Sequence, residues 1–248
     1  MARQGMDRFT PRTGIADPFD EPSSPQQGRD PDFPLHLIDI RILELLTARL
    51  CHELSGPIAA INNGVELLAE EDPGLPLTSN PGFLHDAVEL VADSARRARS
   101  RLQFYRFAYG FSSGSATAGP APHEIAIGFF AGTRIIGDYA DGIRMLPPDR
   151  QKLACNLLSV GAAVLPRGGR LVLTDEPLDL EAVGEAAALS PEACEALTLV
   201  TPIAELNART VQPYFTGLLA KWLDLSIIPT VEPGRVRLRS AVRRNDPV

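Results

Sequence analysis

The sequence lacks the features that would place it outside the cell, on nucleic acid or across a membrane. It has only three cysteines, Cys51, Cys155 and Cys194, whose odd number and wide spacing indicate neither a disulfide framework nor a CxxC metal site. The net charge of −7 argues against nucleic-acid binding, because phosphate contacts need a basic surface. No apolar run approaches the roughly 18 residues of a membrane helix, and residues 1–34 contain no apolar segment typical of a secretory signal. We therefore expect a cytoplasmic protein in a reducing compartment.

Composition divides the chain into two ordered blocks. Residues 1–34 are rich in Pro, Gly, Asp and Arg without hydrophobic periodicity, which predicts a disordered tail. Residues 112–123, SSGSATAGPAPH, have the small and proline-rich composition of an interdomain linker. The two predicted domains therefore span 35–111 and 124–244.

The first block predicts a helical hairpin. Apolar residues recur at steps of three and four along two segments, which gives one apolar stripe on each helix. The stripes are Leu43, Leu46, Leu50, Leu54, Ile58, Ile61, Val65 and Leu68 on the first helix, and Leu84, Val88, Val91, Ala95, Ala98, Leu102, Tyr105 and Tyr109 on the second. Two helices alone bury too little surface to be stable, so we expect two copies to form a dimeric four-helix bundle. The alternative is a hairpin that packs only on the second block.

The second block mixes helical and strand periods and predicts an α/β domain, with helices on one face of a mixed sheet. In its last strand Arg235, Arg237 and Arg239 alternate with apolar or small residues, which is typical of a half-exposed strand. Helices are predicted at 147–166, 191–199 and 211–225, and strands at 171–174, 225–231 and 235–242.

The residue most suggestive of chemistry is His52. At about 100° per residue, His52 lies about 200° from Leu50 and Leu54, so it points away from the apolar stripe. A neutral imidazole is a good nucleophile near pH 7. The other interpretation is an exposed helix histidine with no task. The residues on the same face are small and would leave the ring open to another macromolecule: Ser55, Gly56, Ala59 and Asn63.

Two neighbours of this histidine suggest how it is set up. Glu53 is a candidate to accept the ring proton or to hold the tautomer, although an acidic residue there could equally serve solubility. Pro57 removes one backbone donor and predicts a bend just past the histidine.

The segment HELSGPIAAINNGVELL resembles the H-box of sensor histidine kinases, in which a phosphoacceptor His is followed by an acidic residue and, five positions on, by Pro. His52, Glu53 and Pro57 match that motif, whereas Ser55 and Gly56 depart from it. The closer resemblance is to the ChpT-type histidine phosphotransferases of alphaproteobacterial phosphorelays. These share the Leu-Cys-His-acid segment and an Arg-rich second helix, here SARRARSRLQFYRFAYG. The resemblance spans about 36–244 and is strongest in 47–110.

The resemblance implies a relay intermediate. His52 would accept a phosphoryl group from an aspartate of a hybrid histidine kinase's receiver domain. It would pass the group to receiver domains of cell-cycle response regulators, similar to CtrA or CpdR. The receiver would supply Mg²⁺, so this homodimeric chain would need no metal or cofactor of its own.

The resemblance also implies that the second block is a degenerate histidine-kinase ATPase domain of the Bergerat type. LACNLLSVGAAVLPRGG resembles the kinase segment NLLxN, whose first Asn is present as Asn156. The second Asn, which would bind the Mg²⁺ of ATP, is replaced by Val160, and a valine offers no oxygen ligand. We therefore predict no ATP binding. A non-catalytic, pseudokinase-like docking module for receiver domains remains the alternative.

A basic run on the second predicted helix is the last candidate. It contains Arg96, Arg97, Arg99, Arg101 and Arg106. A solvated helix face explains such a run slightly better than a binding role does. In a hairpin, however, Arg97 and Arg101 would lie near His52, where they could attract the acidic site of a receiver.

Overall fold

The computed structural model describes residues 39–69, 81–110 and 122–243. The predicted tail at 1–34 and residues 112–121 of the predicted linker lie outside the described residues. Pro122 and His123, which the sequence assigned to the linker, are the first two residues of a helix.

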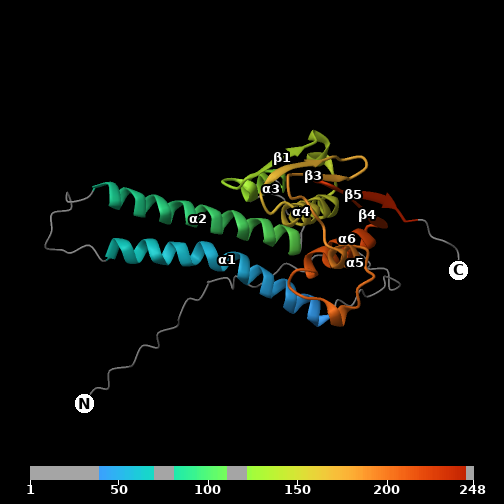
Figure 1. Cartoon of the computed structure of the whole chain (residues 1–248), viewed down its shortest axis with the longest axis horizontal. Helices are drawn as coiled ribbons and strands as arrows, with labels where there is room; N and C mark the ends of the chain where they lie inside the picture. The colour runs from blue at the N-terminus through green and yellow to red at the C-terminus, as the bar shows by residue number, and fades with distance from the viewer. Residues whose placement is uncertain (1–38, 70–80, 111–121, 244–248) are drawn as a thin grey trace, which may run out of the picture. The chain divides into compact units, whose positions relative to one another are not determined.

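The predicted hairpin is confirmed. Helices α1 (Ile40–Ala69) and α2 (Pro81–Tyr109) run side by side in opposite directions (Figure 1). Gly64 permits their close approach, because a Cβ there would lie 2.5 Å from Cγ2 of Val91. Buried Ala87 and Ser94 continue the contact along α2. Among the described residues, no helix is both long and apolar enough to cross a membrane.

The apolar stripes are only half covered. Leu46 on α1 and Tyr105 on α2 are buried, as predicted. The other edge of each stripe stays open, however: Ile58 and Val65 are 49% and 51% exposed, and Val88 and Leu102 are 54% and 51% exposed. The described chain therefore covers one edge of each stripe and leaves an apolar row along both helices.

The second block is a mixed α/β domain, as predicted. Its elements are α3 (Pro122–Phe130), β1 (Ile135–Tyr139), the 3₁₀ helix η1 (Asp141–Met145), α4 (Pro148–Ala163), β2 (Gly169–Leu173), β3 (Leu180–Val183), α5 (Pro191–Leu197), the 3₁₀ helix η2 (Ile203–Glu205), α6 (Val211–Trp222), β4 (Leu225–Glu232) and β5 (Arg235–Val242). The sheet order is β1-β2-β3-β5-β4; β1 and β2 are parallel and the other neighbours are antiparallel.

The two faces of the sheet differ in chemistry. One face carries buried apolar side chains that pack with α4 and α6. On the other face Arg237 lies opposite Glu181 across the β3–β5 ladder, and its Nε donates to Oε2 of Glu181 at 2.5 Å. Arg235 and Arg239 add ion pairs of 3.6 and 3.5 Å to Glu181 and Asp179. The predicted half-exposed strand at 235–242 is thus confirmed.

The base of the hairpin packs on the α/β domain. Near the start of α1, Ile42 and Leu46 join an apolar cluster with Leu206 and Val211. At the end of α2, the ring of Phe104 stacks on Phe129 of α3, with 4.0 Å between centroids. The hairpin therefore does pack on the second block, but the apolar rows along its helices remain open.

Candidate functional site

His52 lies in the middle of α1 with an exposed side chain. The helix presents three faces at this level. Leu46, buried against the α/β domain, and Gly64, buried against α2, lie about 120° to one side of His52, and the exposed Ile58 lies about 120° to the other. The imidazole therefore stands clear both of the intrachain contact and of the open apolar row.

The small residues predicted on this face are all exposed. Ser55, Gly56, Ala59 and Asn63 surround the imidazole with short side chains. A Cβ added at Gly56 would meet nothing within 4 Å. The Ser55 hydroxyl donates to the carbonyl of Cys51 at 2.8 Å, so its proton is directed at its own helix. No hydrogen bond or ion pair between described residues involves the His52 ring, which leaves both of its nitrogens open to solvent.

Glu53 points away from the ring, toward α2. Its carboxylate forms an ion pair with the Arg101 guanidinium, and the two side chains are 24% and 33% exposed. Nη1 of Arg101 also donates to the backbone carbonyl of Glu53 at 3.4 Å. The predicted role of Glu53 in proton handling remains a prediction, but its described partner is the arginine rather than the imidazole.

The two arginines predicted for docking have different environments. Arg101 is half-buried, and its Cζ lies 6.0 Å from the ring centroid of Phe129, in addition to its contacts with Glu53. Its charge is therefore largely directed inside the chain, and its role in docking stays a prediction. Arg97 is exposed and lies beside Gly132, 4.0 Å from the point that a Cβ there would occupy. Arg97 keeps the setting expected of a residue that attracts an acidic partner.

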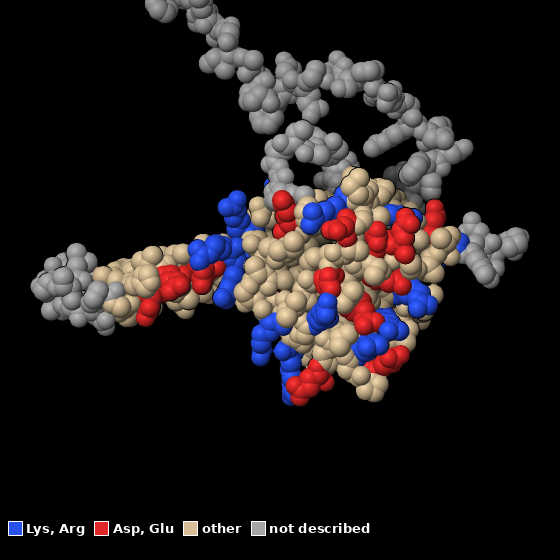
Figure 2. Space-filling view, turned by 90° about the horizontal axis from the view of Figure 1, so that it is seen from above, with Lys and Arg blue, Asp and Glu red and all other residues tan. Residues whose placement is uncertain are grey.

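Charge is segregated along α2. Its first half carries Asp86, Glu89 and Asp93, and its second half carries the arginine run. In Figure 2 acidic side chains line the outer part of the hairpin, and basic ones gather where the hairpin meets the α/β domain. His52 lies at the level of Arg101, and therefore at the basic end of the hairpin.

Comparison with known proteins identifies the family. A family model described as the histidine phosphotransferase C-terminal domain matches residues 122–230. Protein phosphotransferase ChpT from Brucella abortus (strain 2308) is 33% identical over 211 residues, which cover 80% of this chain and 95% of that protein. The chain belongs to the ChpT-type histidine phosphotransferases. A solved structure of a bacterial phosphotransferase matches with a TM-score of 0.66 and 29% identity, over 84% of this chain and 99% of that one. The resemblance found in the sequence is thus confirmed.

In this phosphotransferase Asn156, which matches the first Asn of the kinase segment, makes buried hydrogen bonds between helices. It is fully buried, and its Nδ2 donates to the carbonyl of Ala108, at the end of α2, at 2.9 Å. Its Oδ1 accepts from Nε2 of Gln212 on α6 at 3.0 Å, and the Tyr109 hydroxyl donates to Oε1 of the same glutamine. Sequence reasoning missed this network, because its members lie far apart in the chain.

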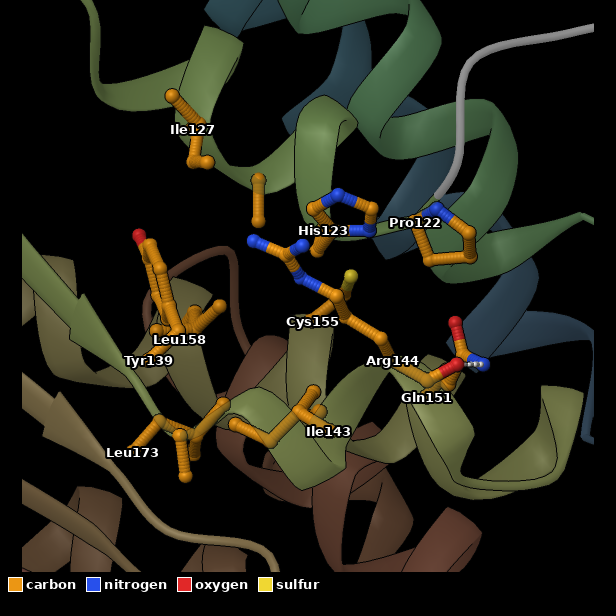
Figure 3. A pocket seen from close by; sticks show the side chains of 13 residues that line it. Pro122, His123, Ile127, Tyr139, Ile143, Arg144, Gln151, Cys155, Leu158 and Leu173 are labelled. Carbon is orange, nitrogen blue, oxygen red and sulfur yellow. Dashed lines mark hydrogen bonds between the residues drawn. The ribbon is translucent and has the colours of Figure 1, made fainter.

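A cavity in the α/β domain of the phosphotransferase lies apart from the His52 face. It is lined by residues of α3, β1, η1, α4 and β2, with none from α1 (Figure 3). Arg144 and His123 face its interior, and the buried Tyr139 hydroxyl has no hydrogen-bond partner among the described residues. Burial raises the pKa of the Cys155 thiol to about 12, which makes this cysteine a poor nucleophile.

Proposed function

We propose that His52 carries the phosphoryl group of a multistep phosphorelay. Its neutral imidazole attacks the phosphorus of an aspartyl-phosphate on a receiver domain. The new P–N bond forms as the P–O bond to the aspartate breaks, and the aspartate leaves as a carboxylate. The attacking nitrogen is the unprotonated one, so no base is needed to activate it. The reverse transfer delivers the group to the aspartate of a second receiver.

The observation that carries the proposal is the exposed His52 ring, about 120° from both the buried side and the open apolar row of its helix. A donor aspartate sits in a folded domain, so the acceptor must be reachable by a macromolecule. The small side chains of Ser55, Gly56, Ala59 and Asn63 leave room for such a surface. Catalysis is then mainly positioning.

The proposed partners are receiver domains: one of a hybrid histidine kinase as donor, and CtrA- or CpdR-like response regulators as acceptors. A receiver's phosphorylation site is acidic and brings its own Mg²⁺, which neutralises charge on the transferring group. The exposed Arg97 supports this pairing, because an acidic domain is attracted to the basic end of the hairpin. No metal or cofactor is assigned to this chain, and a cytoplasmic location follows from cytoplasmic partners.

We also propose that two chains associate through the open apolar rows. Ile58 and Val65 lie seven residues apart on α1, as do Val88 and Ala95, and Ala95 and Leu102, on α2. Seven-residue spacing is the repeat of helices packed in bundles. Because the row lies about 120° from His52, a dimer built on it leaves the imidazole open.

The dimer can be tested by light scattering. The wild type is expected at twice the chain mass of 26.8 kDa, and Ile58→Asp with Val65→Asp is expected at one chain mass. Ala59→Asp with Asn63→Asp places the same two charges on the His52 face and should stay dimeric. A monomeric wild type would refute the association.

ATP is not expected to be the phosphoryl source. Val160 replaces the metal-binding asparagine of the kinases and is buried. The buried Asn156 is committed to Ala108 and Gln212. An ATP-dependent kinase would label itself with radioactive ATP and no other protein, which we expect not to occur.

The decisive experiment uses a CtrA-type receiver domain charged with labelled acetyl phosphate. The wild type should acquire acid-labile, base-stable phosphate, and His52→Gln should acquire none. His85→Gln, an exposed histidine on α2, is the matched control and should label like the wild type. A wild type that binds the receiver but takes no label would favour the docking module. Label that persists in His52→Gln would reject His52 as the acceptor.

A further inference from the structure

The helix turn that carries His52 lacks one of its backbone hydrogen bonds. Pro57 lies inside α1 and has no backbone N–H, so the carbonyl four residues earlier, that of Glu53, receives no helical hydrogen bond. A shielded carbonyl left without a donor destabilises the folded chain. The donor comes from the neighbouring helix, because Nη1 of Arg101 lies 3.4 Å from this carbonyl.

The same guanidinium binds the side chain of Glu53. Its ion pair with the carboxylate joins α1 to α2 next to the phosphoacceptor. With 24% and 33% of the two side chains exposed, solvent screens the pair only in part. Arg101 thus holds both the backbone and the side chain of the residue that directly follows His52.

A third contact reaches the α/β domain. The Cζ of Arg101 lies 6.0 Å from the ring centroid of Phe129 on α3, a cation–π distance. Phe129 is itself held, because it stacks on Phe104 and meets Tyr105 edge-on, with centroids 4.0 and 5.7 Å apart. The guanidinium therefore touches one residue on each side, Glu53 of α1 and Phe129 of α3.

We propose that Arg101 is a positioning residue for phosphoryl transfer, which clamps the Pro57 bend of α1 to the α/β domain and so aims His52. This inference rests on the function proposed above. The His52 ring makes no hydrogen bond to a described residue, so its direction is set by its own backbone. That backbone is fixed at the next residue by Arg101. In this proposal Glu53 is the residue through which Arg101 holds α1, rather than a base.

The clamp requires arginine rather than any cation. A planar guanidinium can donate to a carbonyl, pair with a carboxylate and lie over an aromatic ring at the same time. A lysine is a point charge and cannot meet all three demands. Arg101→Lys is therefore expected to behave much more like Arg101→Gln than like the wild type.

The first test separates positioning from docking. With the charged CtrA-type receiver as donor, Arg101→Gln should lower kcat about 10- to 100-fold and leave KM within about twofold. Arg97→Gln, on the exposed side of the same helix, should instead raise KM and leave kcat within about twofold. Phosphoramidate, a small donor that needs no docking, should label His52 of Arg101→Gln at the wild-type rate, because the reactivity of the imidazole itself is unchanged.

The second test addresses the carbonyl itself. Pro57→Ala restores a backbone N–H that can donate to the Glu53 carbonyl. In that background the loss of kcat caused by Arg101→Gln should be at least about threefold smaller than in the wild-type background. Equal factors in both backgrounds would overturn the clamp. An unchanged kcat for Arg101→Gln, beside a wild type that transfers, would overturn the positioning role alone. A wild type that takes no phosphoryl group from any charged receiver would overturn this role together with the proposed function.

Discussion

The hairpin and the α/β domain place the same residue types in opposite environments. Leu102, Asn63 and Cys51 of the hairpin are exposed, whereas α/β-domain residues of the same types, such as Leu171, Asn156 and Cys155, are buried. These three α/β-domain side chains are therefore covered within the chain. The hairpin leaves an apolar row and a histidine face open, so a second chain and a receiver would each have a surface to bind.

Leu171 and Leu102 should show the largest difference in the loss of stability on substitution by alanine. Leu171 is 0% exposed, and its Cδ2 lies 2.9 Å from where a Cβ of Gly161 would be, so α4 packs tightly over β2. Leu171→Ala should lower the free energy of unfolding by about 2–5 kcal/mol in urea titrations. Leu102→Ala, at 51% exposure, should change a dilute monomer by about 0.5 kcal/mol or less.

Association gives the leucine comparison a second readout. If the open row is a dimer contact, the wild-type Tm rises with protein concentration and Leu102→Ala weakens that rise. Equal destabilisation by the two leucine substitutions at low concentration would mean that the hairpin row is already covered within one chain.

Asn156 and Asn63 should show the next largest difference in the loss of stability on substitution by alanine. Asn156→Ala removes the hydrogen bonds to the Ala108 carbonyl and to Nε2 of Gln212, which keeps only a 3.4 Å contact with Oγ1 of Thr216. We expect a loss of about 2–3 kcal/mol in the free energy of unfolding. Asn63→Ala should stay within about 0.5 kcal/mol, because water replaces its contacts. If Asn156→Ala instead retained full stability, the interdomain network would not hold the domains together.

Local periodicity predicted what depends on one helix at a time. The exposure of His52 follows from its phase relative to Leu50 and Leu54, which is fixed as soon as the segment is helical. The strand at 235–242 was equally visible, because its arginines alternate with buried residues. The family was found in the same way, from a contiguous motif around the histidine.

Features that depend on long-range pairing were missed. The contact between Arg101 and Glu53 was not predicted, because only the folded hairpin brings these residues together, 48 positions apart. Strands β1 and β3 were not predicted, since strand preference depends strongly on the neighbours in the sheet. The stripes of the hairpin gave the apolar faces but could not tell which edge is covered within the chain.

Cys155 gives the smallest effect near neutral pH, and its contribution to the free energy of unfolding changes only at alkaline pH. An unfolded thiol has a pKa near 9.0, and burial raises the pKa of Cys155 to about 12 in the folded protein. Above about pH 9 the unfolded chain therefore releases a proton that the folded chain keeps, so stability falls as pH rises. The slope from this thiol is at most about 1.4 kcal/mol per pH unit, and urea titrations between about pH 8 and pH 11 should resolve it.

Burial likewise raises the pKa of Tyr105 to about 12, which adds a slope of the same sign. Cys155→Ala should flatten the total slope. A slope in Cys155→Ala equal to that of the wild type would contradict the burial of this thiol.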